Sequence, residues 1–212
     1  MKEIIEKSKC CGCNACGDVC PKGAITFQTD KEGFWYPEIN QNLCIDCGLC
    51  QKTCPVLTKA DNVIRYDEPL VYAAYTKDEA IRTDSTSGGI HSMLALAMYE
   101  QNAYIGGAIY NKDHTVKHIV SPDCQLLPEI RSSKYLQSSM EGAYKEVRDL
   151  LKAGEKVFFC GTPCQIQGLY KFLRKEYDNL TTCDFICRGV NSPKVFLSYM
   201  DMLEKQYGSK AT

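Results

Sequence analysis

The stretch Cys10–Pro21, CCGCNACGDVCP, decides the first part of the fold, because its cysteine spacing returns in Cys44–Pro55, CIDCGLCQKTCP. Both runs read C-x2-C-x2-C-x3-C-P, the pattern that holds two 4Fe-4S clusters in bacterial proteins. In this pattern the fourth cysteine of each run ligates the other cluster. We therefore expect a first cluster on Cys10, Cys13, Cys16 and Cys54, and a second on Cys44, Cys47, Cys50 and Cys20.

Two other uses of the cysteines compete with this interpretation. The chain has 14 cysteines in 212 residues, a density typical of disulfide scaffolds or metal sites. Structural zinc uses four ligands per site without the trailing C-x3-C-P. A disulfide scaffold needs an oxidising compartment, whereas the charged start MKEIIEKSK is no secretory signal and predicts a cytoplasmic protein. Cys11 has no place in the pattern, and we interpret it as a bystander.

Charge and hydropathy limit the partners. The net charge is -1, without a dense block of Lys or Arg, so nucleic acid is not expected as a partner. The longest apolar run, roughly 93–98, is far shorter than a membrane span. We expect no membrane span.

The pattern of the chain changes near residue 58. Residues 1–57 should form an α+β ferredoxin-like two-cluster module, with a hairpin of 24–29 and 34–39 between its cysteine runs. Residues 58–69 are polar and suit a linker. Residues 70–212 alternate strands, at 70–76, 104–110, 116–120, 156–159 and 180–186, with amphipathic helices, which predicts an α/β domain. The chain stops one helix after its last strand, so we expect this domain to be incomplete at its C-terminus.

Four places in the second domain carry chemistry. Ser87-Gly88-Gly89 precedes a helix and offers a seat for a phosphate, although such a turn is also a common helix cap. Ser133-Lys134-Tyr135-x2-Ser138 pairs a cation with an aromatic residue, a pattern more typical of a solvated loop. Cys160-Gly161-Thr162-Pro163-Cys164-Gln165 and Cys183–Gly189 each follow a strand, so Cys164 and Cys187 should meet at the carboxyl edge of the sheet unless they are buried structural cysteines. No role is assigned to His91, His114 or His118.

Together these motifs resemble the family of coenzyme F-420 hydrogenase/dehydrogenase beta subunits, in its versions with an N-terminal ferredoxin module. The match rests on the two cysteine runs, Ser85–Gly89, Ser133–Ser138, Phe159–Gly168 and Asp184–Pro193. The resemblance implies FAD in the α/β domain and a further 4Fe-4S cluster, whose ligands in this chain would be Cys164 and Cys187. Arg188 departs from the histidine that many relatives carry. The expected cofactor-binding residues are Ser87, Gly88, Gly89, Lys134, Tyr135, Ser138, Gly161, Thr162, Pro163 and Gln165.

These expectations favour an iron-sulfur flavoprotein oxidoreductase subunit. It would pass electrons between a soluble hydride-carrying cofactor (coenzyme F-420 or a substitute), FAD and the clusters, and onward to a redox partner protein or subunit. Because a hydride carries two electrons and each cluster takes one, flavin is needed to split the pair. Two alternatives stay open: a non-catalytic electron carrier that docks to a partner enzyme, and a cysteine-based redox enzyme using Cys160 and Cys164.

Overall fold

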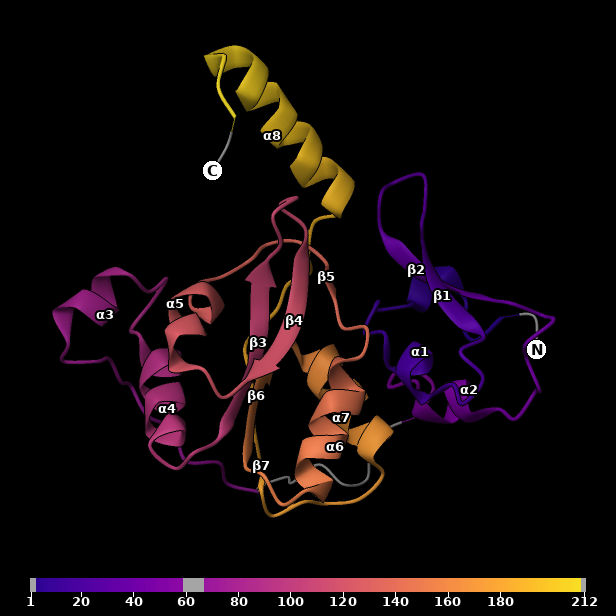
Figure 1. Cartoon of the computed structure of the whole chain (residues 1–212), viewed down its shortest axis with the longest axis horizontal. Coiled ribbons are helices and arrows are strands. Elements are labelled where there is room, and N and C mark those ends of the chain that lie inside the picture. Colours follow the sequence, from indigo (N-terminus) through magenta and orange to yellow (C-terminus); the bar gives the residue numbers. More distant parts are fainter. Residues whose placement is uncertain (1–2, 59–66, 211–212) are drawn as a thin grey trace.

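The structure is a computed structural model that describes residues 3–58 and 67–210. A small cysteine-rich module lies beside a larger α/β domain (Figure 1). Most of the expected linker, residues 59–66, lies outside the described residues. No helix of the described ranges is long and apolar enough to cross a membrane.

The N-terminal module repeats one small unit twice. The 3-10 helix η1 (Lys7–Lys9) leads into α1 (Ala15–Val19), and the hairpin of β1 (Ile25–Thr29) and β2 (Trp35–Ile39) leads into α2 (Leu49–Thr53). The strands are antiparallel, with Ile25 opposite Ile39, which confirms the expected hairpin. Each short helix follows a residue in the left-handed conformation, Asn14 at φ 61° and Gly48 at φ 71°.

The second domain is built on a mixed five-stranded sheet in the order β5-β4-β3-β6-β7. Its strands are β3 (Tyr104–Tyr110), β4 (Val116–Ser121), β5 (Ser138–Ser139), β6 (Val157–Gly161) and β7 (Leu180–Asp184). Only β3 and β4 are antiparallel to each other, and the other neighbouring pairs are parallel. The sequence predicted four of these strands, although not the antiparallel pair.

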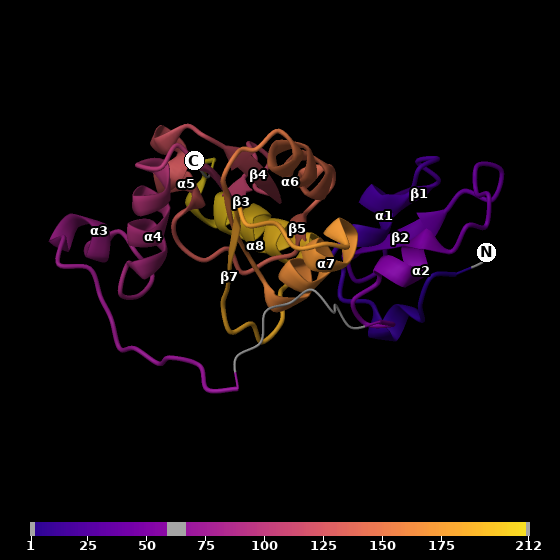
Figure 2. The same ribbon diagram turned by 90° about the horizontal axis from the view of Figure 1, so that it is seen from below.

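Helices cover both faces of this sheet. On one face α4 (Ile90–Tyr99) and α5 (Leu127–Ile130), preceded by η2 (Cys124–Leu126), bury Phe158 and Ile105. On the other face α6 (Ala143–Lys152) and α7 (Pro163–Leu173) bury Phe159 and Tyr144. Neighbouring residues of β6 thus point to opposite cores, as strand geometry requires. Figure 2 shows α6 and α7 between the sheet and the cysteine-rich module.

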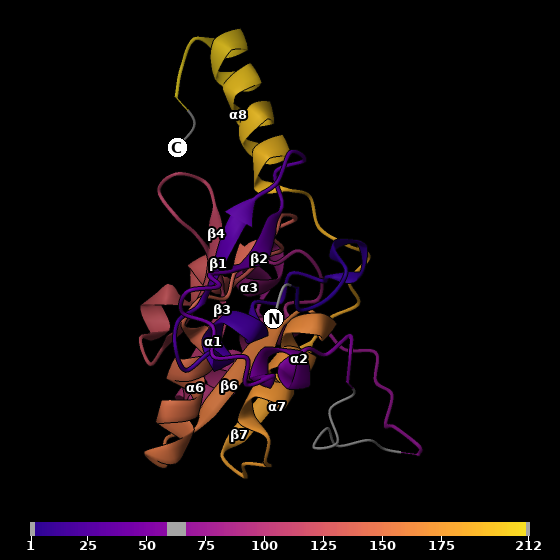
Figure 3. The ribbon, with the colours of Figure 1, turned by 90° about the vertical axis from the view of Figure 1, so that its right-hand side faces the viewer.

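The expected helix starts are confirmed at two strand ends. Thr162 caps α7 with Pro163 at its first position, and Gln165 completes a capping box. Ser192 caps α8 (Pro193–Tyr207) by accepting a hydrogen bond from the Val195 N–H. Of α8 only Pro193 is buried, and the helix projects from the domain (Figure 3).

The strand expected at 70–76 is wrong. Residues 70–76 form no regular element, and Leu70 and Val71 are 82% and 88% exposed. A short helix, α3 (Glu79–Thr83), follows instead, and the Thr76 N–H donates to the Gly88 carbonyl at 2.7 Å. The apolar pattern indicates a strand only where a neighbouring strand offers backbone partners, and this segment has none among the described residues.

Candidate iron-sulfur centres and redox site

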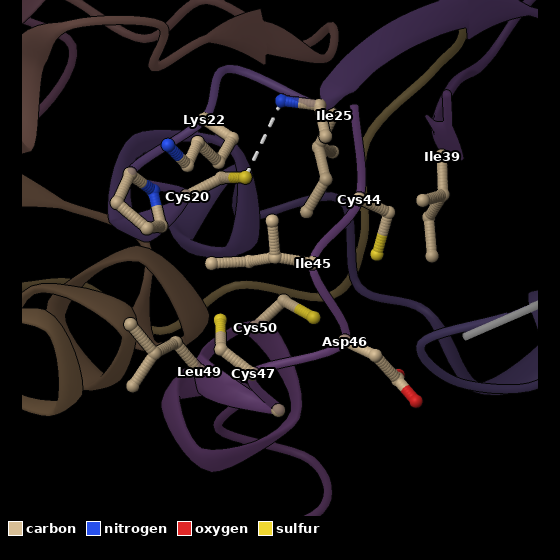
Figure 4. A pocket seen from close by; sticks show the side chains of 13 residues that line it. Cys20, Lys22, Ile25, Ile39, Cys44, Ile45, Asp46, Cys47, Leu49 and Cys50 are labelled. Atoms are coloured by element: carbon tan, nitrogen blue, oxygen red, sulfur yellow. Dashed lines mark hydrogen bonds between the residues drawn. The ribbon is translucent and has the colours of Figure 1, made fainter. Parts of the chain in front are cut away.

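Cys20 shares one cavity with three cysteines of the second run. The cavity is lined by Cys20, Cys44, Cys47 and Cys50, with Ile25, Ile39 and Ile45 among its apolar neighbours (Figure 4). Its empty volume, including space open to solvent, is about 380 Å³. The Ala24 N–H donates to the Cys20 sulfur at 3.3 Å.

Cys54 lies, conversely, with the first run. A second cavity of about 340 Å³ is lined by Cys10, Cys13, Cys16 and Cys54, together with Cys11, Ile4 and Phe27. The crossing has a local cause, since Cys20 and Cys54 are the residues at which α1 and α2 end. The two helices pack against each other, so each final cysteine reaches the cavity of the other run.

The donor set fits iron-sulfur clusters. Each cavity brings together the four cysteines expected to bind one cluster, with Cys11 as an additional thiol in the second cavity and no histidine in either. Soft thiolates are the ligands of these clusters. Burial raises the pKa of the Cys10, Cys16 and Cys50 thiols, so without a cation their charged forms are disfavoured. In the described parts of the chain no three His, Cys, Asp or Glu side chains are placed to hold a single metal ion.

The cavity of the first run faces the α/β domain. The Tyr144 hydroxyl, on α6, lies 2.8 Å from the Cys13 carbonyl oxygen and 3.1 Å from that of Gln165 on α7. A side chain at Gly168 would lie 3.4 Å from the Cys13 sulfur and 3.3 Å from Ala15. The close approach of α7 to the first cysteine run therefore depends on a glycine.

Two polar side chains form hydrogen bonds between the cysteine-rich module and the α/β domain. Asp18 accepts hydrogen bonds from the Gly142 N–H at 2.8 Å and the Tyr144 N–H at 3.1 Å, so a carboxylate of the module caps α6. Burial nevertheless raises the pKa of Asp18. Gln137 bonds both backbone groups of Trp35, at 2.8 and 3.0 Å, and ties β2 to the segment before β5.

The turn after β6 brings several expected flavin residues together. Gln165 accepts from the Thr162 N–H at 2.9 Å and donates to the Ser138 hydroxyl at 2.9 Å. Gly161 and Pro163 belong to the same turn, the carboxyl end of a parallel strand. This is the edge at which ligands of α/β sheets bind.

Lys134 lies in the segment that follows α5. Its ammonium group donates to the carbonyl oxygens of Glu129, Ile130, Arg131 and Ser132, at the end of α5. Burial lowers the pKa of Lys134 to about 8. Its donors are engaged in capping a helix, while the neighbouring Tyr135 is 68% exposed.

Ser87-Gly88-Gly89 forms the loop before α4. A Cβ on Gly88 would lie 2.8 Å from the Ala74 carbonyl oxygen, so this glycine permits close backbone packing. Gly89 has φ +75° and caps α4 without a side-chain hydrogen bond. The Ser133 N–H donates to the Thr86 hydroxyl at 3.1 Å, which links this loop to the segment that leads to Ser138.

Four cysteines of the second domain lie at or just beyond the carboxyl ends of β6 and β7. Cys164 contacts Thr162, at 3.1 Å between its sulfur and the hydroxyl, and its sulfur lies 4.0 Å from the Cys11 carbonyl oxygen. Cys187 bonds the Gly189 N–H at 3.4 Å. The thiols that face each other across the strands are those of Cys160 and Cys183, which are register partners on β6 and β7. The contact of Cys11 with Cys164 had no sequence signal, because it joins residues 153 positions apart.

Of the histidines without an expected role, His118 is buried and His91 is half-buried. His118 stacks on Phe159 and His91 lies against Phe158, on opposite faces of the sheet. His118 Nδ1 and His91 Nε2 are buried without a hydrogen-bond partner. Burial lowers the pKa of His118 to about 4 and also lowers that of His91, so both imidazoles are neutral near pH 7.

Comparison with known families agrees with both parts of the chain. Residues 9–58 match the 4Fe-4S dicluster domain. Residues 154–211 match the C-terminal domain described as coenzyme F420 hydrogenase/dehydrogenase, beta subunit. The combination confirms the resemblance drawn from the sequence motifs, and with it a ferredoxin-like module followed by an α/β domain.

Individual relatives align with 60–81% of this chain. The chain is 30% identical over 177 residues to the coenzyme F420-dependent sulfite reductase of Methanocaldococcus jannaschii, covering 81% of this chain and 26% of that protein. It is 23% identical over 174 residues to one subunit of the F(420)H(2) dehydrogenase of Methanosarcina mazei, covering 78% and 49%. A chain of the F420-reducing [NiFe] hydrogenase complex from Methanosarcina barkeri aligns at a TM-score of 0.48 and 22% identity, over 60% of this chain and 47% of that one. The chain thus spans about a quarter to a half of the curated relatives it matches.

Proposed function

From the combination of a 4Fe-4S dicluster domain with a domain of the coenzyme F420 hydrogenase/dehydrogenase beta subunits, we propose that this chain is the electron-transfer part of an F420-linked oxidoreductase. The observation that carries the proposal is the sorting of eight cysteines around two cavities, one of which abuts the α/β domain. Two 4Fe-4S clusters bound there would supply one-electron transfer. The first would be held by Cys10, Cys13, Cys16 and Cys54, and the second by Cys44, Cys47, Cys50 and Cys20.

The contacts of the two cavities support an order of electron transfer. Cys13 touches α6 through the Tyr144 hydroxyl and α7 at Gly168. The other cavity has exposed lining residues, since Cys47 is exposed and Ile45 is 57% exposed. The α/β domain would therefore exchange electrons with the first cysteine set, and a redox partner protein would dock at the second.

The α/β domain would hold FAD at the carboxyl edge of its sheet. The N-terminus of α4 lacks a side-chain cap, which suits a diphosphate at Ser87, Gly88 and Gly89. Ser138, Gly161, Thr162, Pro163 and Gln165 would form the opposite wall, with Tyr135 beside it. Lys134 would act indirectly, by fixing the end of α5 from which the wall extends. When bound, the flavin supplies the exchange of a hydride for single electrons.

A further cluster and the hydride carrier complete the proposal. Cys164 and Cys187 would be ligands of a third 4Fe-4S cluster. Thr162 donates or accepts at the Cys164 sulfur, and the Gly189 N–H donates to the Cys187 sulfur, as hydrogen bonds to cluster ligands do. Coenzyme F420 is the proposed hydride carrier because both named relatives act with it.

The test is a combined count of iron, sulfide and flavin in the full chain purified without oxygen. We expect eight or more irons per chain and flavin retained after added FAD is removed by gel filtration. Eight irons without flavin would replace the flavoprotein proposal by a pure electron carrier. Fewer than eight irons, unchanged by reconstitution with iron and sulfide, would contradict the two-cluster assignment.

The flavin seat has a sharper test in Ser87→Asp. An acidic side chain at the N-terminus of α4 stabilises the helix itself, whereas it repels a bound diphosphate. Ser209→Asp, on the exposed end of the chain beyond α8, is the matched control. We expect loss of flavin with unchanged iron in Ser87→Asp only. Equal flavin retention in both variants would exclude the α4 seat.

A further inference from the structure

Cys160 and Cys183 occupy equivalent positions on two neighbouring parallel strands. Cys160 is the penultimate residue of β6 and Cys183 that of β7, and the two are register partners. Register partners lie on the same face of a sheet, about 4.8 Å apart in Cα position. That separation falls within the Cα range that a disulfide spans, about 4.4–6.8 Å. A bond between the two sulfurs therefore needs no rearrangement of the backbone.

The surroundings of the two thiols favour exchange chemistry. Both side chains are half-buried, and β7 is the edge strand of the sheet, so one side of the pair is open. A hydrogen bond from Cys160 lowers the pKa of Cys183. The same hydrogen bond, together with burial, raises the pKa of Cys160. Cys183 is thus the better nucleophile, because the thiolate is the attacking form.

Neither cysteine is used by the proposed function. The cluster sets and the third-cluster ligands leave both out, and the family motifs of this region centre on Cys164 and Cys187. The pair is also separate from the contact of Cys164 with Cys11, which lies at the module interface. Two facing thiols at the carboxyl end of parallel strands therefore need an explanation of their own.

We propose that Cys160 and Cys183 form a dithiol site that reacts with low-molecular-weight disulfides. The Cys183 thiolate attacks one sulfur of R–S–S–R, which forms a mixed disulfide and releases one thiolate, RS⁻. The Cys160 thiol then gives up its proton and attacks the Cys183 sulfur, which forms the Cys160–Cys183 disulfide and releases the second RS⁻. The disulfide reagent is reduced by two electrons and the protein dithiol is oxidised by two, so no other oxidant enters.

The fixed register supports this sequence of steps. Backbone pairing of Phe159 with Thr182 and of Gly161 with Asp184 holds the two cysteines opposite each other on both sides. The resolving thiol is therefore already beside the mixed disulfide when it forms. Such proximity converts the second step into an intramolecular one, which is faster than attack by a thiol from solution.

Oxidation with glutathione disulfide tests the proposal. The cluster-loaded full chain, carrying Cys124→Ser to remove an exposed thiol, is treated without oxygen, alkylated and digested with trypsin. We expect one disulfide joining peptide 157–171 to peptide 176–188, located at Cys160 and Cys183 by fragmentation. Cys160→Ser should instead trap one glutathione on Cys183. Cys183→Ser should leave Cys160 unmodified under the same conditions.

The controls separate the site from cluster ligation. We expect iron content to be unchanged in Cys160→Ser and Cys183→Ser, and loss of iron in either variant would make the cysteine a cluster ligand and overturn the proposal. A disulfide between Cys164 and Cys187 would also overturn it. The proposal would likewise be overturned if the Cys124→Ser chain formed no Cys160–Cys183 bond under conditions in which the exposed Cys124 of the unsubstituted chain becomes glutathionylated. If the Cys160→Ser or Cys183→Ser variant does not fold, the presence or absence of the Cys160–Cys183 disulfide in the Cys124→Ser chain decides the proposal.

Discussion

Tyr144→Phe should weaken the contact between the cysteine module and the α/β domain. The side chain of Tyr144 is fully buried, and its ring stacks on Phe172. Its hydroxyl is the group that reaches both the Cys13 and the Gln165 carbonyl oxygens. Phenylalanine keeps the ring and removes only that hydroxyl, so the change isolates the hydrogen bonds.

The expected loss follows from burial. Removing one partner of a buried hydrogen bond costs about 1–3 kcal/mol, and a central value of about 2 kcal/mol lowers the folding constant about 30-fold. For a chain of this size the melting temperature should fall by roughly 4–8 °C. The assay is thermal unfolding of cluster-loaded protein without oxygen at a fixed scan rate, followed by circular dichroism and by cluster absorbance.

Tyr99→Phe is the matched control. Its hydroxyl also donates to a backbone carbonyl, that of Asp123 at 3.1 Å, but at an exposed site. We expect a change within about 0.5 kcal/mol there. Equal shifts in the two variants, or a Tyr144→Phe melting temperature unchanged from that of the parent, would refute the assignment of the hydroxyl to the domain contact.

Three further predictions concern other residues of the two parts. Cys54→Ala should remove the spectroscopic signal of the cluster built on the first cysteine run and leave the signal of the second cluster unchanged. Cys124→Ala is the control. Loss of the second cluster's signal in Cys54→Ala would contradict the crossed ligand sets. Gln137→Ala should lower the free energy of unfolding by about 2 kcal/mol, because both bonds to Trp35 are lost, whereas Gln101→Ala, at an exposed site, should have little effect. Burial lowers the pKa of His118 to about 4 in the folded state, below its unfolded value of about 6.5. Its neutral form therefore contributes fully to the free energy of unfolding above pH 6.5. This contribution is lost as the pH falls toward 4, by up to about 3 kcal/mol. Urea midpoints between pH 7.5 and 5.5 should therefore fall less in His118→Gln than in the parent, and parallel curves would exclude His118 as the cause.

The position of the cysteine-rich module against the α/β domain explains why its two cavities differ in their neighbours and in their exposure to solvent. The first cysteine run is covered by α6 and α7, which supply the Tyr144 hydroxyl, the Asp18-capped helix end and the space at Gly168. The second run meets solvent through Cys47 and its apolar neighbours. One module thus offers a cavity beside the α/β domain and a cavity open to solvent, which is consistent with the proposed electron transfer from the domain to a partner.

The sequence by itself determined the features that depend on local spacing. The two cysteine runs, the hairpin between them and the Thr162-Pro163 and Ser192-Pro193 helix starts each involve residues close in the chain, so their periodicity and capping chemistry are visible in the sequence. The alternation of strands and helices likewise indicated an α/β domain, because sheet and helix periodicities differ.

Tertiary structure decided the features that join distant residues. Residues 70–76 form no strand, because no strand of residues 3–58 or 67–210 pairs with them. Lys134 caps the end of α5, because its ammonium group donates hydrogen bonds to four carbonyl oxygens of the preceding turn. The pairing of Cys160 with Cys183 depends on the register of β6 against β7, which is set by the whole sheet. Asp18 caps α6 from 124 residues away. Such contacts leave no periodic signal in the sequence, because they arise only when separately folded elements pack together.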